Sequence, residues 1–261
     1  MTTSRDVPAE FWDHLKELRT RLVWSFLALI LGSVAGFLVA EPIMRILSQP
    51  IGGLEFLVAI EITESFVEYM RVALLTGFIL ALPVIVWQVG GWFTLALEPR
   101  EKRWLYISIP AATVLFLLGA AFTFFVMLPA AVPFLTGFIA EIKTTPRLSN
   151  YIAFVTNLMF WVGLAFETPL LAFILAKLRL LTAGALAKQW RIAIVIIAIL
   201  AAFITPTGDP FNMMLLMAPL LVLYLVSIGL ALLAGERKPR APKKAKPARG
   251  EKKLRKKQKE K

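Results

Sequence analysis

A glutamate and an arginine near the amino terminus are spaced so that the two charges can pair with each other or one of them can bind a charged ligand. Glu17 and Arg21 belong to the stretch His14-Leu15-Lys16-Glu17-Leu18-Arg19-Thr20-Arg21-Leu22. Four residues apart, they can pair across one helical turn, which stabilises a helix by about 0.3 kcal/mol. One interpretation is a solvated salt bridge. The alternative is a carboxylate that serves a ligand.

The same stretch is amphipathic and runs directly into an apolar segment. Phe11, Leu15, Leu18 and Leu22 recur at helical spacing, and polar side chains fill the other side. We therefore expect residues 1–21 to form a helix in the membrane interface, ahead of the first crossing.

A second group of charges, Glu98-Pro99-Arg100-Glu101-Lys102-Arg103, follows the aromatic pair Trp92-Phe93. Taken alone, it is an ordinary charged turn. Together with Glu17, however, it places carboxylates next to aromatic groups on one face of the membrane. Two partly desolvated carboxylates suit a cationic ligand, above all guanidinium, which binds a carboxylate through two parallel hydrogen bonds.

A third candidate, Glu167, lies in the apolar run Val162–Leu170, where Thr168 and Pro169 predict a break in the helix. An ionisable residue within a membrane is costly and therefore suggests a function. The alternative is a glutamate that reaches one interface or pairs structurally within the protein.

Other acidic residues have simpler explanations. Asp209 belongs to the turn that begins at Thr205, where its side chain could stabilise the turn or cap the next helix. Glu61, Glu64 and Glu68 recur on one face of a segment expected on the outer side of the membrane, and we expect them to be solvated.

Signals of an enzyme are weak. His14 is the single histidine, there are no cysteines, and no nucleophile, zinc or phosphate-loop motif occurs. We expect a protein that is not an enzyme and that holds no metal or other cofactor.

Composition predicts the fold class. The chain is 58% hydrophobic and 18% charged, with a mean hydropathy of +0.73, which is too apolar for a soluble domain. We predict an all-α membrane protein with six transmembrane helices over 22–234, the last two short, and a kink at Pro83. The uncharged runs are 22–40, 72–97, 104–140, 148–166, 192–208 and 210–235.

Basic residues predict the orientation. They concentrate in 1–21, 98–103, 177–191 and 235–261, so both termini should be cytoplasmic in a multi-pass protein of the cytoplasmic (inner) membrane. The tail 235–261 holds fourteen basic and three acidic residues. We expect it to be disordered and to contact anionic lipids, with RNA contact as the alternative. The rest of the chain is near neutral and indicates no nucleic-acid partner.

These residues resemble the TatC family, the multispanning core subunit of the twin-arginine protein translocase. The similarity covers about residues 10–233, and the stretch 14–22 is its most specific part. Further matching motifs are Pro50, Leu82-Pro83-Val84-Ile85-Val86-Trp87-Gln88-Val89, Glu98–Arg103, Phe166-Glu167-Thr168-Pro169, Thr205-Pro206 and Asp209-Pro210.

The resemblance implies a receptor for the signal peptides of folded precursor proteins, with export driven by the proton-motive force. Glu17 and Glu101 would bind the twin arginines, and Arg19, Arg21, Trp92 and Arg103 would shape that site. Glu167, with Thr205 and Asp209, would dock the TatA-like and TatB-like single-span subunits. Self-association is also expected, and Pro50, Pro83 and Pro169 would be structural.

Two positions depart from the family pattern. Met213 stands where the family usually has glutamine, and Leu225 where it often has glutamate after the tyrosine. The polar cluster on the last two segments is therefore thinner. A transporter that couples proton flux to Glu167 is the alternative function, although the facing segments carry no interior charges and no internal repeat is present.

Overall fold

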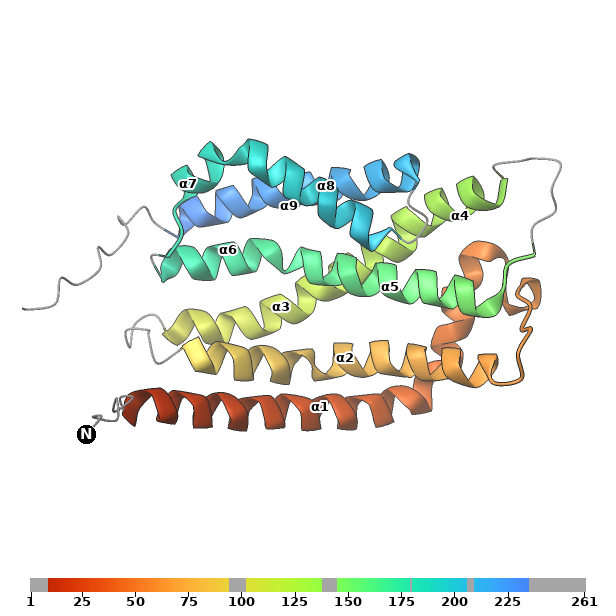
Figure 1. The fold of residues 1–261 in the computed structure, drawn as a ribbon, viewed down its shortest axis with the longest axis horizontal. Helices are drawn as coiled ribbons and strands as arrows, with labels where there is room; N and C mark the ends of the chain where they lie inside the picture. The colour runs from red at the N-terminus through yellow and green to blue at the C-terminus, as the bar shows by residue number, and fades with distance from the viewer. Residues whose placement is uncertain (1–8, 94–101, 138–144, 179, 206–208, 235–261) are drawn as a thin grey trace, which may run out of the picture.

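The computed structural model describes residues 9–93, 102–137, 145–178, 180–205 and 209–234, and the side chains within them except those of 9–14, 92, 93 and 102–105. Nearly all of these residues are helical (Figure 1). The helices are α1 (Ala9–Leu47), α2 (Glu64–Phe93), α3 (Lys102–Phe122), α4 (Leu128–Gly137), α5 (Leu148–Phe166), α6 (Thr168–Lys177), α7 (Ala183–Lys188), α8 (Trp190–Ile204) and α9 (Pro210–Leu233). The predicted all-α class is confirmed.

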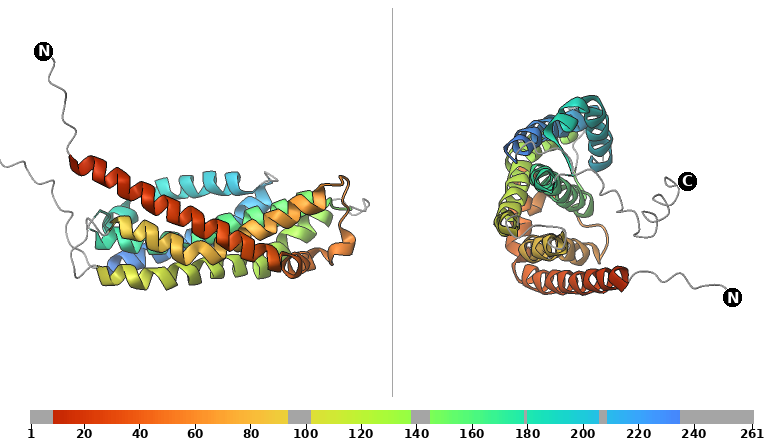
Figure 2. Two further views of the ribbon diagram at one scale, coloured as in Figure 1. Left: turned by 90° about the horizontal axis from the view of Figure 1, so that it is seen from below. Right: turned by 90° about the vertical axis from the view of Figure 1, so that its left-hand side faces the viewer.

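The helices are long and apolar enough for a membrane protein. Five described helical segments could each cross a bilayer, and α8 is a shorter apolar helix. Large apolar side chains point outward along the bundle, for example Leu38, Phe203 and Leu233, as expected where lipid is the solvent. Viewed from one end, the helices form a curved, open arrangement (Figure 2).

The elements that hold the candidate residues gather at two ends of the bundle (Figure 1). The N-terminal end contains the beginnings of α1 and α3, the ends of α2, α6 and α9, and α7. The opposite end contains the end of α1, the turns η1 (Gln49–Ile51) and η2 (Leu54–Phe56), the beginnings of α2 and α5, and the end of α4. The described residues next to the segments predicted to be cytoplasmic thus lie at one end of the bundle (Figure 1).

Helix α1 is longer than the sequence suggested. Its 39 residues run without a break through Arg21 and Leu22, so the amphipathic stretch and the first span are one helix. It also continues past Pro42 to Leu47, because proline removes only one helical hydrogen bond and can be accommodated as a bend.

Helices α1 and α2 pack closely as an antiparallel pair. A Cβ atom added to Gly36 would lie 2.9 Å from the backbone nitrogen of Gly77, so glycines are required where the two backbones touch. The Tyr69 hydroxyl donates to the carbonyl of Phe37 at 2.8 Å. This packing fixes α1, which carries the N-terminal charges, against α2.

The third span continues past Pro129. Helix α3 passes through a π-helical turn, η4 (Thr123–Met127), into α4, which contains Pro133 and ends at Gly137. A π turn is a typical distortion within a long helix. It ends two residues before Pro129, and the helix continues through α4 to Gly137.

The fourth span contains the break that Pro169 predicts. Helix α5 ends at Phe166, Glu167 lies at the junction, and α6 begins at Thr168 with proline in its first turn. Arg147 is the N-cap of α5, and Ser149 lies inside the first turn.

Only one of the last two spans is short. Helix α8 has 15 residues and α9 has 24. At 1.5 Å per residue, α8 covers about 22 Å of a hydrocarbon core about 30 Å thick. The prediction of two short helices therefore needs correction for α9, which covers nearly the whole uncharged run 210–235 and contains Pro219.

Candidate functional site

Glu17 and Arg21 form a partly buried ion pair on the first turns of α1. The guanidinium donates from Nε at 3.0 Å and from Nη2 at 2.6 Å, both times to Glu17 Oε1. The side chains are 33% and 22% exposed, respectively. Among the described residues, Glu17 Oε2 accepts no hydrogen bond. Half of the carboxylate is thus occupied and the other half is available.

Arg21 also contacts α2. Its Nη1 approaches the carbonyl oxygen of Gln88 at 3.4 Å. A Cβ atom added to Gly91 would lie 2.7 Å from Cζ of Arg21, so the guanidinium fills the space that this glycine leaves. The arginine therefore lies between its own helix and the end of α2.

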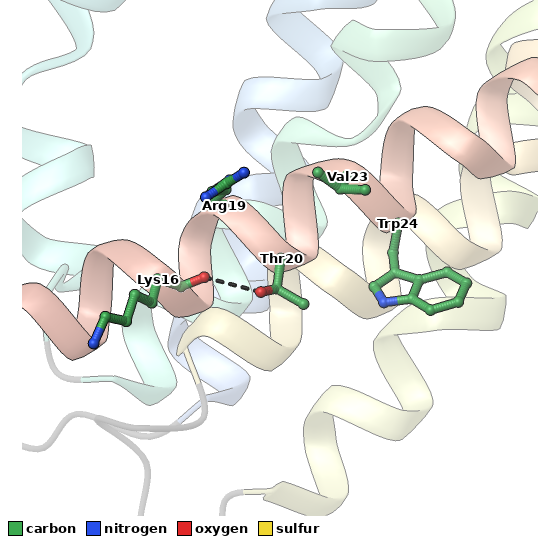
Figure 3. Close-up of a pocket in the computed structure, with 5 residues that line it drawn as sticks. All are labelled: Lys16, Arg19, Thr20, Val23 and Trp24. Carbon is green, nitrogen blue, oxygen red and sulfur yellow. Dashed lines mark hydrogen bonds between the residues drawn. The ribbon is translucent and has the colours of Figure 1, made fainter.

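The neighbouring face of α1 carries further cationic and aromatic groups. Lys16, Arg19, Thr20, Val23 and Trp24 line a hollow of about 330 Å³ (Figure 3). The Thr20 hydroxyl donates to the carbonyl of Lys16 at 3.0 Å, as the dashed line shows. Arg19 and Arg21 are thus in different settings: Arg21 pairs with Glu17, and Arg19 lines the exposed hollow.

The other members of the predicted site lie at the same end of the bundle or outside the described residues. Trp92 is in the last turn of α2 and Arg103 in the first turn of α3, and the description of these two residues does not extend to their side chains. Glu101 lies outside the described residues.

Glu167 lies at the junction of α5 and α6, partly buried. Its Oε1 atom is buried and has no hydrogen-bond partner among the described residues. The Thr168 hydroxyl donates to the carbonyl of Ala165 at 2.7 Å, satisfying one group freed by the helix break. A buried, unpaired carboxyl oxygen is costly, which fits the sequence-based reading of Glu167 as more than a packing residue.

Thr205 and Asp209 flank the turn between α8 and α9 and have local partners. The buried Thr205 hydroxyl donates to the carbonyl of Ala201 at 2.7 Å. Asp209 caps α9: its Oδ1 accepts from the Asn212 backbone nitrogen at 2.7 Å and its Oδ2 from Asn212 Nδ2 at 2.8 Å. The capping interpretation of Asp209 is confirmed. Asn212, which sequence reasoning missed, is buried with Oδ1 unpaired in the described part of the chain.

Pro50 and Pro83 lie in different local structures. Pro50 lies in the 3₁₀ turn η1, just before Gly52 and Gly53, whose φ angles are 103° and 123°. Such positive φ angles favour glycine. Pro83 lies inside α2.

The acidic residues at the opposite end correct the expectation of a solvated helix face. Glu64 and Glu68 are 4% and 2% exposed. Glu64 accepts from the backbone nitrogens of Ile60 at 2.9 Å, Glu61 at 3.3 Å and Ser149 at 2.7 Å, and from Arg147 Nε at 3.1 Å. The carboxylate is buried because these donors replace its hydration.

Arg147 is the partner that sequence reasoning overlooked. Its Nη2 donates to Glu61 Oε1 at 2.6 Å, and its backbone bridges to Val58. Hydrogen bonds to Glu61 and then Glu64 raise the pKa of Arg147. One available signal was its position, because Arg147 is among the few basic residues outside the four cationic segments.

Comparisons with known proteins place this geometry in one family. Residues 13–219 match the family described as Sec-independent protein translocase protein (TatC). The TatC protein of Carboxydothermus hydrogenoformans is 36% identical over 87% of this chain and 94% of its own length, and that of Aquifex aeolicus is 37% identical over 87% and 96%. A crystal structure of the twin arginine translocase receptor TatC is 36% identical, covers 85% of this chain and 99% of its own, and aligns with a TM-score of 0.74.

Proposed function

This chain belongs to the TatC family, and we propose that its Glu17 and Glu101 bind the paired arginines of a signal peptide. As a family member it is a non-enzymatic, multi-pass membrane component of the Sec-independent, twin-arginine translocase, with the role of signal-peptide receptor. The remaining question is which of its residues perform that role.

The observation that carries the site assignment is the half-occupied carboxylate of Glu17. It already holds one guanidinium in the chain's own Arg21, so its setting is chemically suited to that group. Guanidinium and carboxylate pair most strongly through two parallel bonds, and ammonium cannot reproduce that geometry. A requirement for arginine over lysine follows from this chemistry.

Other residues at this end would complete the site. We assign Glu101 to the second arginine, and Trp92, Arg19 and Arg103 to shaping the surroundings. Trp92 and Arg103 support the assignment by their places at the end of α2 and the beginning of α3, which lie at the same end of the bundle as the beginning of α1 (Figure 1).

The intramembrane polar residues would serve partner proteins. A TatA-like or TatB-like single-span helix with a polar side chain of its own could satisfy the unpaired Glu167 Oε1. Thr205 and Asp209 would also contribute to docking, although both already have local hydrogen bonds. Export would then use the proton-motive force through the assembled partners.

The topology supports a proposed orientation. We place the N-terminal end of the bundle in the cytoplasm of a cell with the protein in its inner membrane, because the basic segments meet there. The first turns of α1 would lie in the interface, residues 22–234 would form the membrane domain, and the basic tail would contact anionic lipids. Self-association of the receptor is part of the same proposal.

The test is binding of a fluorescent signal peptide to the solubilised protein, comparing Arg-Arg with Lys-Lys at the motif. We expect the Arg-Arg peptide to bind more tightly, and Glu17→Gln or Glu101→Gln to weaken it by roughly tenfold or more. Glu41→Gln is the matched control, since Glu41 pairs with Arg45 at the same spacing on the same helix but at its other end. Normal binding by both Glu17→Gln and Glu101→Gln would show that the site is elsewhere.

A further inference from the structure

The carboxylate proposed to bind the signal peptide is already engaged by an arginine of the same chain. Arg21 directs Nε and Nη2 to a single oxygen of Glu17. A ligand guanidinium that forms two parallel bonds needs both carboxylate oxygens. Full engagement of Glu17 therefore requires Arg21 to release Oε1.

The position of Arg21 is built into the packing of two helices. Besides Glu17, the guanidinium meets the Gln88 carbonyl and the space left by Gly91 on α2. A residue with any side chain at position 91 would collide with Nη1 and Cζ of the arginine. The resting contact is thus specified by α2 as well as by the i, i+4 spacing on α1.

We infer that Arg21 is an internal competitor, occupying the Glu17 carboxylate in the resting receptor and yielding it only to a ligand that supplies an equivalent guanidinium. This inference rests on the proposed function of Glu17. It makes Arg21 a specificity-determining residue. Removal of its side chain should strengthen the binding of lysine ligands more than that of arginine ligands.

A ligand that binds Glu17 exchanges its own cation for the guanidinium of Arg21. An incoming arginine replaces two charge-assisted hydrogen bonds with two of the same kind, so the exchange costs little. An incoming lysine is a point charge without the planar fork and replaces them less well. Displacement also leaves the Arg21 guanidinium without its carboxylate in a partly buried setting, a cost that a lysine ligand offsets less well than an arginine ligand does. Lysine ligands therefore face a barrier that arginine ligands overcome.

The experiment measures Kd for Arg-Arg and Lys-Lys peptides with the full chain in detergent, for wild type, Arg21→Gln and Gly91→Ala. We expect Arg21→Gln to tighten Lys-Lys binding by roughly three- to fivefold and to narrow the Arg-Arg preference accordingly, as expected for removal of a partly exposed ion pair. Gly91→Ala, which pushes the guanidinium off α2 without changing any charge, should act in the same direction to a smaller extent.

Matched controls separate this effect from loss of charge or of glycine. Arg45→Gln removes an arginine with the same fork geometry to Glu41 at the far end of α1, and Gly229→Ala fills open space in α9. Both should leave both affinities unchanged.

The outcomes distinguish the two proposals. If Glu17→Gln abolishes binding and Arg21→Gln weakens the Arg-Arg peptide in the same way, Arg21 supports the ligand and the competitor inference is wrong. The same holds if Arg21→Gln leaves the Lys-Lys affinity unchanged. If Glu17→Gln has no effect on binding, the proposed site fails and the inference fails with it. Thermal unfolding of each variant shows whether the protein is folded.

Discussion

Two carboxylate–guanidinium pairs, one at each end of the bundle, differ in how fully the carboxylate is satisfied. Glu64 has a side chain only 2% exposed, and both of its oxygens accept hydrogen bonds, from three backbone nitrogens and Arg147. Glu17 is one-third exposed and uses a single oxygen. The first pair joins residues 83 positions apart, and the second lies within one helical turn.

The two pairs therefore differ in whether they can still bind a ligand. A buried carboxylate whose donors are all in place has no capacity left for a ligand, and its removal leaves several buried groups unpaired. A partly exposed carboxylate, one oxygen of which accepts no hydrogen bond in the described part of the chain, contributes little to stability and retains an acceptor for another donor. Saturation, more than charge or burial alone, separates a structural pair from a binding pair.

Removal of the saturated Glu64 carboxylate should have the largest effect. Glu64→Gln keeps the shape but substitutes donor hydrogens for an acceptor that several N–H groups need, so we expect the midpoint of thermal unfolding to fall by roughly 5–10 °C. Intrinsic tryptophan fluorescence in detergent would measure it. Glu61→Gln, which loses only one exposed contact to Arg147, should cause a much smaller decrease. Equal effects would mean that saturation is not what matters.

Salt should separate the two ends next. Raising NaCl from about 50 mM to about 500 mM shortens the screening length, so binding of an Arg-Arg peptide at the exposed Glu17 should weaken by roughly fivefold. The buried Glu64 contacts should be screened far less, leaving the thermal midpoint within about 2 °C. Peptide titration and thermal unfolding in the same buffers would test this. Salt-insensitive binding would argue that the peptide is held chiefly by apolar contacts.

The fold was largely predictable because the hydropathy of each span is a local property. The apolar runs predicted the spans, and Pro169 predicted the junction at Glu167. The first span extends beyond the uncharged run 22–40, because Pro42 lies inside α1 and does not end it. A missing hydrogen bond can be absorbed by a bend within a packed bundle, and Pro129 likewise lies within α4, just after the π turn.

The candidate site was predictable only in part, for a similar reason. Glu17 and Arg21 pair at a spacing visible in any helical sequence. Glu64 and Arg147 become partners only after the chain folds back and Val58 bridges to Arg147. Their burial could not be read from helical periodicity, which described the same glutamates as a solvated face.

A third carboxylate, that of Glu68, is buried but is not saturated with hydrogen bonds. Glu68 is 2% exposed, its Oε2 accepts no hydrogen bond among the described residues, and Arg71 Nη1 lies 3.4 Å away. The cost of desolvating this charge is not offset by hydrogen bonds. We expect Glu68→Gln to leave the thermal midpoint unchanged or to raise it by about 1–3 °C. A decrease as large as that of Glu64→Gln would show that burial alone sets the contribution.

The smallest expected effect comes from a pair that copies the geometry of Glu17–Arg21 in a different place. Arg45 directs Nε at 3.3 Å and Nη2 at 2.8 Å to one oxygen of Glu41, and both side chains are more than 60% exposed. We expect Glu41→Gln to change the thermal midpoint by less than about 1 °C and the peptide affinity not at all. Both quantities can be measured beside the Glu17→Gln variant. If peptide binding does weaken, the i, i+4 pair on α1 is itself sufficient to attract the ligand. If peptide binding does not weaken, what distinguishes Glu17 is its setting beside the end of α2. There Gly91 and the Gln88 carbonyl hold Arg21, with which a ligand must compete for the carboxylate.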